Sequence, residues 1–494
     1  MVIRATPLSA PVAGRLSEPE SGVLVARLDT RDELGTATES PDSERGVVDG
    51  AVNGAFHDPD PGGVTLDAGD PTVGAQRRRR FGLPRTLDSF RDREFRWFYA
   101  SMLGHMASMN MQLIIRGLLA YELTGSYAVL GLVGLAGALP MLFLAVVGGV
   151  IADRQPKKTV MQLGQAASLA NAAAMAVLVF AGLMTIEWLL VTAALQGAVM
   201  ALMMPARQAM LPEIVGMSRM MNAVSLNMAG MNSMRLFAPA LGGFIVALFG
   251  FGWAFTAMSL LYVVALVSMS KVTWAPATAP GEAGQRALAV GKSALADIGG
   301  GLRYVRRDQT MFVVLGVTFV TSAFGMPIQF LLPGYVADIF AEDASEAANL
   351  AGVLLSISAV GALVGALFLA TIPDKRRGLM FLGGAATLGL GVFLFPQTES
   401  YELAAVFMVI VGLGSAFRMA LSQGLLHSYV EDAYRGRVMS VFMLQMSMMQ
   451  FATFLVGVAA EVVGIRVAIA ALGVMLMAVA ALSAVALPSL RRLD

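Results

Sequence analysis

Twelve apolar runs, each long enough to cross a lipid bilayer, constrain this 494-residue chain more than any other feature. A spanning helix needs about 20 mostly apolar residues, because the hydrocarbon layer is about 30 Å thick and a helix rises about 1.5 Å per residue. Only 14% of the residues are charged and the mean hydropathy is +0.69. The sequence therefore predicts an all-α membrane protein with twelve transmembrane helices. The runs lie at 97–123, 127–151, 159–184, 187–205, 222–249, 252–270, 310–337, 350–372, 378–396, 402–427, 438–462 and 467–488.

A polar interval at 271–309 divides these runs into six and six. It contains Pro276, Pro280 and Gly281 together with several basic residues, a composition that favours a loop or a surface segment over a span. The sequence predicts a six-helix bundle at 88–270, a cytoplasmic linker at 271–309 and a second six-helix bundle at 310–490. Two bundles of this kind are one recurrent architecture of secondary transporters.

Residues 1–87 have a different composition. Acidic residues, Gly, Pro, Ser and Thr dominate up to about position 76, without a sustained apolar period, which is typical of a disordered segment. Arg77, Arg78, Arg79 and Arg80 then form a basic cluster shortly before the first apolar run. We expect a disordered acidic cytoplasmic tail whose basic end lies against anionic lipid headgroups.

Basic residues orient the predicted helices. Of the 35 Lys and Arg residues, all but Arg116, Arg235, Arg418 and Arg466 fall on one side when both termini are placed in the cytoplasm. Cytoplasmic loops carry an excess of Lys and Arg, so this distribution predicts a multi-pass protein of the cell inner (plasma) membrane with both termini cytoplasmic. We expect a monomer whose partners are the lipid bilayer and a small-molecule substrate.

Several classes of activity lack the residues that they require. The chain has no cysteine, which excludes disulfides, thiolate nucleophiles and Cys-ligated metals. Its three histidines have no ligand-spaced partners, so no metal site is predicted, and no GK[ST] phosphate loop indicates ATP coupling. The net charge of +1 does not favour nucleic-acid binding. No nucleophile–base pair is evident, so we expect neither an enzyme nor a bound cofactor.

A charged motif follows the second apolar run. Gly149, Asp153, Arg154, Lys157 and Lys158 occur in the pattern GxxxDRxxKK. A glycine lets two helices approach closely, and an aspartate at a tight loop interacts with a helix N-terminus. The pattern resembles the loop signature between the second and third helices of the major facilitator superfamily. That resemblance implies that Asp153 pairs with the cytoplasmic end of the eleventh helix and latches the inner gate; alternatively, the basic residues only set the topology.

Further strings over about residues 88–490 resemble the enterobactin-exporter-like and macrolide-efflux-like branch of this superfamily. They are FRWFYASML, YELTGSYAVLGLVGLAGALPML, MMPARQAMLPEIV, FAPALGG and YRGRVMS. The resemblance implies the superfamily fold and secondary transport. Two departures from drug–proton antiporters weigh against proton coupling. The fifth run keeps only part of the GPxxGG pattern, at Ala238, Pro239, Gly242 and Gly243, and Ala193 lies near the place of a fourth-helix arginine.

Polar residues inside the runs are candidates for substrate binding, because a charge within a membrane is costly. On a helix, His105, Gln112 and Arg116 fall within about 40° of one another, and Arg235 lies in the fifth run. By analogy with the superfamily, the first, fourth, seventh and tenth helices line the cavity, which adds Gln196, Gln329, Arg418 and Gln423. Alternatively, each arginine reaches an interface or bonds to backbone carbonyls.

These features together predict a secondary transporter that exports a small amphipathic or anionic metabolite or drug by alternating access. Export follows from the family resemblance alone. An importer of the same fold is the nearest alternative. A lipid scramblase, or a membrane scaffold without solute transport, is the alternative from another functional class.

Overall fold

The computed structural model describes residues 89–216, 219–273, 300, 303–372, 376–430, 434–487 and 490. The predicted tail at 1–87 and most of the predicted linker at 271–309 lie outside these residues. Within the described helices, the side chains of residues 145–154, 309, 427, 435–437, 439, 440 and 443 are not described either. All described residues belong to one compact unit, Arg79–Asp494.

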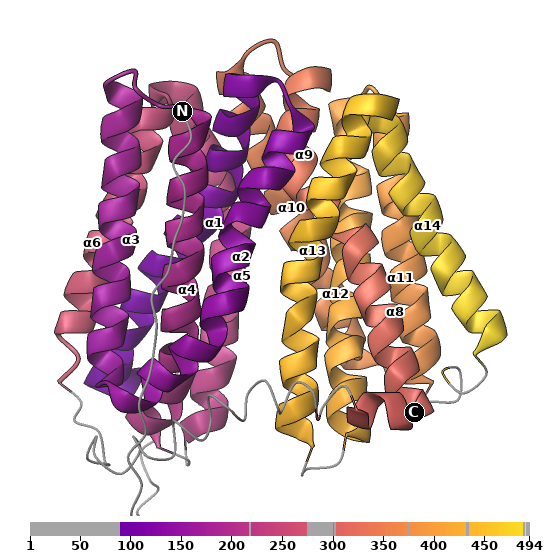
Figure 1. Cartoon of the computed structure of the whole chain (residues 1–494), viewed down its shortest axis with the longest axis horizontal. Helices are drawn as coiled ribbons and strands as arrows, with labels where there is room; N and C mark the ends of the chain where they lie inside the picture. Colours follow the sequence, from indigo (N-terminus) through magenta and orange to yellow (C-terminus); the bar gives the residue numbers. More distant parts are fainter. Residues whose placement is uncertain are drawn as a thin grey trace, which may run out of the picture. The chain divides into compact units, whose positions relative to one another are not determined.

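The described residues form helices and no strands (Figure 1). We call α1–α6 the first bundle and α8–α14 the second bundle. The first comprises α1 (Arg93–Thr124), α2 (Tyr127–Arg154), α3 (Lys157–Phe180), α4 (Ile186–Val215), α5 (Met220–Phe249) and α6 (Phe251–Ser270). The second comprises α8 (Gln309–Gly325), α9 (Pro327–Ile339), α10 (Ala344–Thr371), α11 (Arg377–Leu394), the 3₁₀ turn η3 (Phe395–Gln397), α12 (Tyr401–Tyr429), α13 (Arg435–Val463) and α14 (Ile465–Ala486).

Polar caps fix where several helices begin. The carboxylate of Asp92 accepts a hydrogen bond from the backbone N–H of Glu94 at the start of α1. Asp308, Asp343 and Ser400 cap α8, α10 and α12 in the same way. These caps satisfy N–H groups that have no partner within the helix.

The predicted spans are confirmed as helices, with two differences. By length and composition, eleven described spans are apolar enough to cross a membrane; α1 is not among them because it carries the polar stripe that includes Gln112 and Arg116. The predicted span at 310–337 is confirmed as one apolar span, Thr310–Ile339, but it consists of two helices. The chain breaks at Met326 between α8 and α9, because Pro327 has no backbone N–H to continue the helical hydrogen bonds. Also, α4 continues to Val215, past its predicted end at 205.

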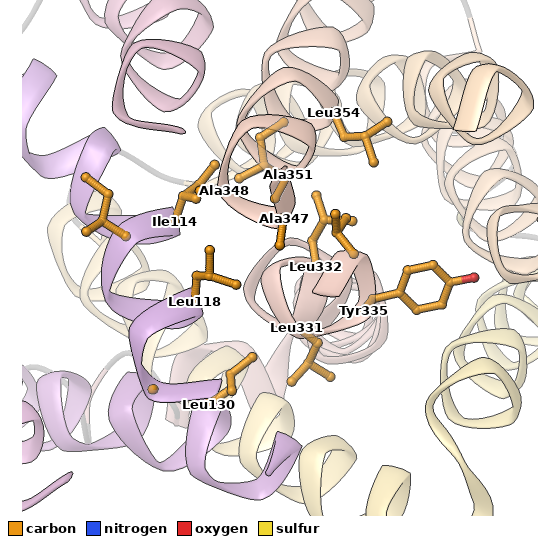
Figure 2. Packing of buried hydrophobic residues seen from close by; sticks show 14 of the residues in the cluster. Ile114, Leu118, Leu130, Leu331, Leu332, Tyr335, Ala347, Ala348, Ala351 and Leu354 are labelled. Carbon is orange, nitrogen blue, oxygen red and sulfur yellow. The ribbon is translucent and has the colours of Figure 1, made fainter. Parts of the chain in front are cut away.

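One hydrophobic cluster joins the two bundles. It contains Ile114 and Leu118 of α1 as well as Leu332 of α9 and Ala347 of α10, all at most 1% exposed. Figure 2 shows the two α1 side chains pointing toward α9 and α10. We call the end of the molecule where α1 ends and α10 begins the closed end, because the bundles share a core there.

Small residues allow the bundles to approach closely near the closed end. A Cβ atom on Gly243 of α5 would lie 2.1 Å from the carbonyl oxygen of Ala348 of α10. A Cβ atom on Gly131 of α2 would lie 2.4 Å from the Cα atom of Phe454 of α13. The pairs α5–α10 and α2–α13 are therefore in backbone contact across the two bundles.

Toward the opposite end, each bundle has a hydrophobic cluster of its own. Phe95, Met161 and Met210 belong to the cluster of the first bundle, and Phe381 and Leu425 to that of the second. The core is thus continuous between the bundles at one end and divided at the other.

Candidate functional site

Arg235 lies on the face of α5 that turns toward α1 and toward α10 of the second bundle. It precedes Pro239, Gly242 and Val246 by four, seven and eleven residues, which places all four on one helix face. The other three are buried: the carbonyl oxygen of Pro239 lies against Gly352 of α10, whereas a Cβ atom on Gly242 would meet Met111 and Ile115 of α1. Arg235 itself is exposed. Met228 lies on the same face, two helical turns before Arg235 and farther from the closed end, and it is 55% exposed. The face that packs against the second bundle thus continues as an exposed surface that carries a guanidinium group.

The polar stripe of α1 faces the interior of the first bundle instead. His105, Gln112 and Arg116 are all at most 8% exposed. The Nε2 atom of His105 is 3.5 Å from the Sδ atom of Met200 of α4, and the His105 ring lies 5.4 Å from that of Tyr262 of α6. The three residues therefore share one face of α1, as predicted from the helical period. That face turns into the first bundle and not toward the exposed surface of α5 that carries Arg235.

Gln196 takes part in a hydrogen-bond network between α3 and α4. Its Nε2 group donates to Ser168 Oγ at 3.2 Å, and its Oε1 atom accepts from Asn171 Nδ2 at 3.4 Å. All three side chains are buried. The network satisfies polar groups that would otherwise be costly inside a bundle.

Arg418 has a comparable position in the second bundle. Its Nη1 group donates to Ser322 Oγ of α8 at 2.8 Å, and this hydroxyl donates in turn to Gln445 Oε1 of α13 at 3.0 Å. Arg418 is 3% exposed. Gln329 and Gln423 are half-buried, and their side chains form no hydrogen bond within the described part of the chain. The predicted substrate residues are thus not gathered in one place.

The predicted gating motif is described only in part. Gly149, Asp153 and Arg154 lie in α2, but their side chains are outside the described residues. Lys157 forms an ion pair with Glu213 of α4. The ammonium group of Lys158 donates to the carbonyl oxygens of Ser270 and Val272 at 3.1 and 2.5 Å, which ties α3 to the end of α6.

Sequence reasoning missed the polar contacts of the closed end. Asp338 of α9 accepts a hydrogen bond from the hydroxyl of Tyr121 of α1 at 2.5 Å and another from Tyr127 of α2 at 2.6 Å. Glu461 of α13 accepts from the hydroxyl of Ser126 at 2.8 Å and from the first turn of α2. Carboxylates of the second bundle therefore bond to donors of the first. In the sequence, the feature that could have indicated these contacts was an acidic residue at the end of an apolar run.

Arg207 was also missed, because the predicted fourth span ended at 205. It lies inside α4 and is half-buried. Its guanidinium group is 3.6 Å from Met106 Sδ and 3.3 Å from Met204 Sδ. Among the residues described here, no group of three or more His, Asp or Glu side chains is arranged to hold a metal ion. The described polar chemistry suits anion binding better, because its buried charges are guanidinium groups.

The chain matches the family model of the Major Facilitator Superfamily over residues 98–453. It is 24% identical to the staphyloferrin A transporter of Staphylococcus aureus over 344 residues, covering 68% of this chain and 82% of that protein. It is 26% identical to the multidrug efflux pump Tap of Mycolicibacterium fortuitum over 385 residues, covering 76% and 91%. Macrolide efflux protein A of Streptococcus pyogenes is 22% identical over 355 residues, covering 70% of this chain and 84% of that protein.

Solved structures of transporters share the fold. A POT family transporter in complex with 5-aminolevulinic acid superposes with a TM-score of 0.64 at 14% identity, covering 83% of this chain and 98% of that one. A peptide transporter POT in complex with sulfate gives a TM-score of 0.63 at 18% identity, covering 84% and 97%. The family match, the spans and the two bundles agree: this chain belongs to the Major Facilitator Superfamily and is a multi-pass secondary transporter of small molecules.

Proposed function

We propose that the protein exports a small anionic or amphipathic compound by alternating access, with Arg235 as the residue that binds the acidic group of the substrate. The observation that carries this proposal is the exposed guanidinium group on the α5 face that meets the second bundle. Within the described part of the chain, Arg235 forms no hydrogen bond or ion pair. A guanidinium group stays charged and presents a planar set of donors that matches a carboxylate or phosphate.

The proposed orientation puts the closed end outside the cell. Lys157 and Lys158 lie at the opposite end, whereas Asp338 and Glu461 lie at the closed end, and this distribution follows the excess of basic residues on cytoplasmic surfaces. The conformation then exposes Arg235 toward the cytoplasm. An exporter must be loaded from that side, so the geometry is that of a carrier ready to receive its substrate.

The names of relatives support export over import. Two of them are called efflux proteins, the multidrug pump Tap and macrolide efflux protein A. Fold likeness alone does not distinguish the directions, so direction has to be measured.

The test is transport into inverted membrane vesicles. We would energise vesicles that contain equal amounts of protein and measure the uptake of carboxyfluorescein, an anionic dye, beside a neutral fluorescent dye of similar size. Wild-type protein should accumulate the anionic dye. Arg235→Gln should weaken its apparent affinity about ten- to a hundredfold, because a hydrogen bond to a charged group contributes about 1.5–3 kcal/mol.

A matched control separates a local effect from loss of positive charge. Arg466→Gln removes an arginine that pairs with Glu399 at the closed end, at 3.1 Å, and should leave dye uptake unchanged. Equal uptake by wild type and Arg235→Gln would disprove the role of Arg235. Accumulation only in right-side-out vesicles would establish an importer, and movement of labelled lipid without dye uptake would establish a scramblase.

A further inference from the structure

Three buried donor groups meet in the interior of the first bundle without a counter-charge. The Nε and Nη2 groups of Arg116 and the Nε2 group of Gln112 form no hydrogen bond with any described residue. Arg116 is 8% exposed and Gln112 is 7% exposed. The Tyr262 side chain of α6 is close enough to Arg116 for an electrostatic interaction.

These donors belong to one location. Gln112 and Arg116 are four residues apart, so their side chains are neighbours on one face of α1. One turn before Gln112 on this face, Ser108 donates to the carbonyl oxygen of Met258 of α6 at 3.0 Å. Because α6 runs antiparallel to α1, Tyr262 lies on the other side of this contact from Gln112, where its ring is 5.4 Å from that of His105. The unpaired donors of Gln112 and Arg116 therefore lie on the face of α1 that packs against α6, inside the first bundle.

The location is separate from the surface between the bundles. Ile114 and Leu118 lie two residues to either side of Arg116, which turns them about 160° away from it around the helix axis. These two side chains pack against the second bundle (Figure 2). A ligand at Arg116 is thus held within the first bundle, whereas a ligand at Arg235 lies between the bundles.

Charge decides what fits this location. A buried guanidinium group cannot lose its proton to reduce the cost of burial, and within the described part of the chain no carboxylate forms an ion pair with Arg116. Water would satisfy the donors but would not balance the charge. Unpaired buried charges are strongly unfavourable. We infer that the first bundle binds a small inorganic anion, of the size and charge of chloride, at the unpaired donors of Arg116 and Gln112, in addition to the transported substrate.

The test is chloride-dependent thermal stability of the full-length protein in detergent. Sodium chloride would replace sodium gluconate at constant ionic strength, and the unfolding temperature would be recorded. A ligand that binds only the folded protein stabilises it in a saturable way. The wild-type unfolding temperature should therefore rise to a plateau, with bromide acting like chloride.

Two variants locate the effect. Gln112→Glu places a carboxylate one turn before Arg116, the favourable order for an ion pair along a helix, and should make the unfolding temperature independent of chloride. Arg116→Gln should also remove the chloride effect. Arg235→Gln is the matched control: it removes an arginine between the bundles and should keep the full chloride effect.

Each result decides the matter. A wild-type unfolding temperature that does not respond to chloride would overturn the inference, as would an undiminished chloride effect in Gln112→Glu. If Arg116→Gln does not fold, Gln112→Glu still provides the answer. Loss of the chloride effect in Arg235→Gln alone would show that the anion binds at the surface between the bundles. This result would also overturn the inference, but it would leave the proposed role of Arg235 intact.

Discussion

The closed end is held by a carboxylate that can be removed without disturbing the hydrophobic packing. Asp338 of α9 accepts hydrogen bonds from Tyr121 of α1 and Tyr127 of α2, so it joins the second bundle to the first. The two tyrosine rings lie 5.0 Å apart. We predict that replacing Asp338 shifts the protein toward the conformation in which the closed end is open.

The size of the shift follows from these two bonds. A hydrogen bond to a charged group contributes about 1.5–3 kcal/mol, and the value for Tyr121 belongs at the low end because its bond is exposed to solvent. Asp338→Ala should therefore destabilise the closed end by about 3–4.5 kcal/mol. Asp338→Asn keeps an acceptor oxygen but loses the charge. We expect it to destabilise the closed end by about 1–2 kcal/mol, which shifts the equilibrium between the closed and open conformations of this end about five- to thirtyfold.

The absence of cysteine provides the assay. Ala347→Cys introduces a single thiol at a position that is 0% exposed in the core shared by the bundles. In intact cells, the rate of its reaction with a membrane-impermeant thiol reagent reports how often the closed end opens to the outside. Asp338→Ala and Asp338→Asn should raise this rate, the former more.

The combination of Tyr121→Phe with Tyr127→Phe keeps both rings and removes both hydroxyls, so it should match Asp338→Ala. Adding Asp338→Ala to this pair should have little further effect, because the same bonds are already lost. Asp343→Asn is the control: among the described residues, Asp343 bonds to Ser345 and Glu346 of its own helix and to no residue of the first bundle. Unchanged labelling in both Asp338→Ala and the tyrosine pair would refute the reasoning.

Three further predictions concern other parts of the chain. Gly243→Ala should force α5 and α10 apart and raise labelling of the same reporter, because its Cβ atom would lie 2.1 Å from Ala348 O, whereas Gly383→Ala, with nothing within 4 Å, should not. Asp153→Asn should slow transport at saturating substrate more than it weakens substrate binding, since the amide loses an interaction with a helix end of about 0.3–1 kcal/mol; a loss of affinity alone would contradict the gating role. Deletion of residues 2–75 should leave membrane insertion and dye transport intact, which fractionation and vesicle uptake would check.

Helices were predictable from the sequence because length and hydropathy determine which segments a membrane can accept. The break in the seventh span was not predicted, although Pro327 was visible, because proline is tolerated inside α4 at Pro205 and Pro212. Whether a proline kinks or interrupts a helix depends on what surrounds the freed backbone groups. Those surroundings are known only from the tertiary structure.

The candidate site was predictable only as a set of residue types. Helical period correctly put His105, Gln112 and Arg116 on one face of α1, but periodicity does not say which neighbour that face meets. Arg235 lies on a face of α5 whose other members are Met228, Pro239, Gly242 and Val246, and its exposure could be recognised only when the neighbouring helices were seen against that face. The bonds of Asp338 join segments more than 200 residues apart, which no local pattern encodes.

The position of Arg235 indicates how its charge affects the conformational change of the empty carrier. Alternating access requires the end opposite the closed end to close, which brings the second bundle over the α5 surface that carries Arg235. Burying a bare guanidinium group is costly, whereas burying one paired with an acidic substrate is much less so. We infer that Arg235 penalises closure of the empty carrier. Arg235→Gln should then raise labelling of Ala347→Cys when no substrate is present, and unchanged labelling would show that the guanidinium group binds without controlling the cycle.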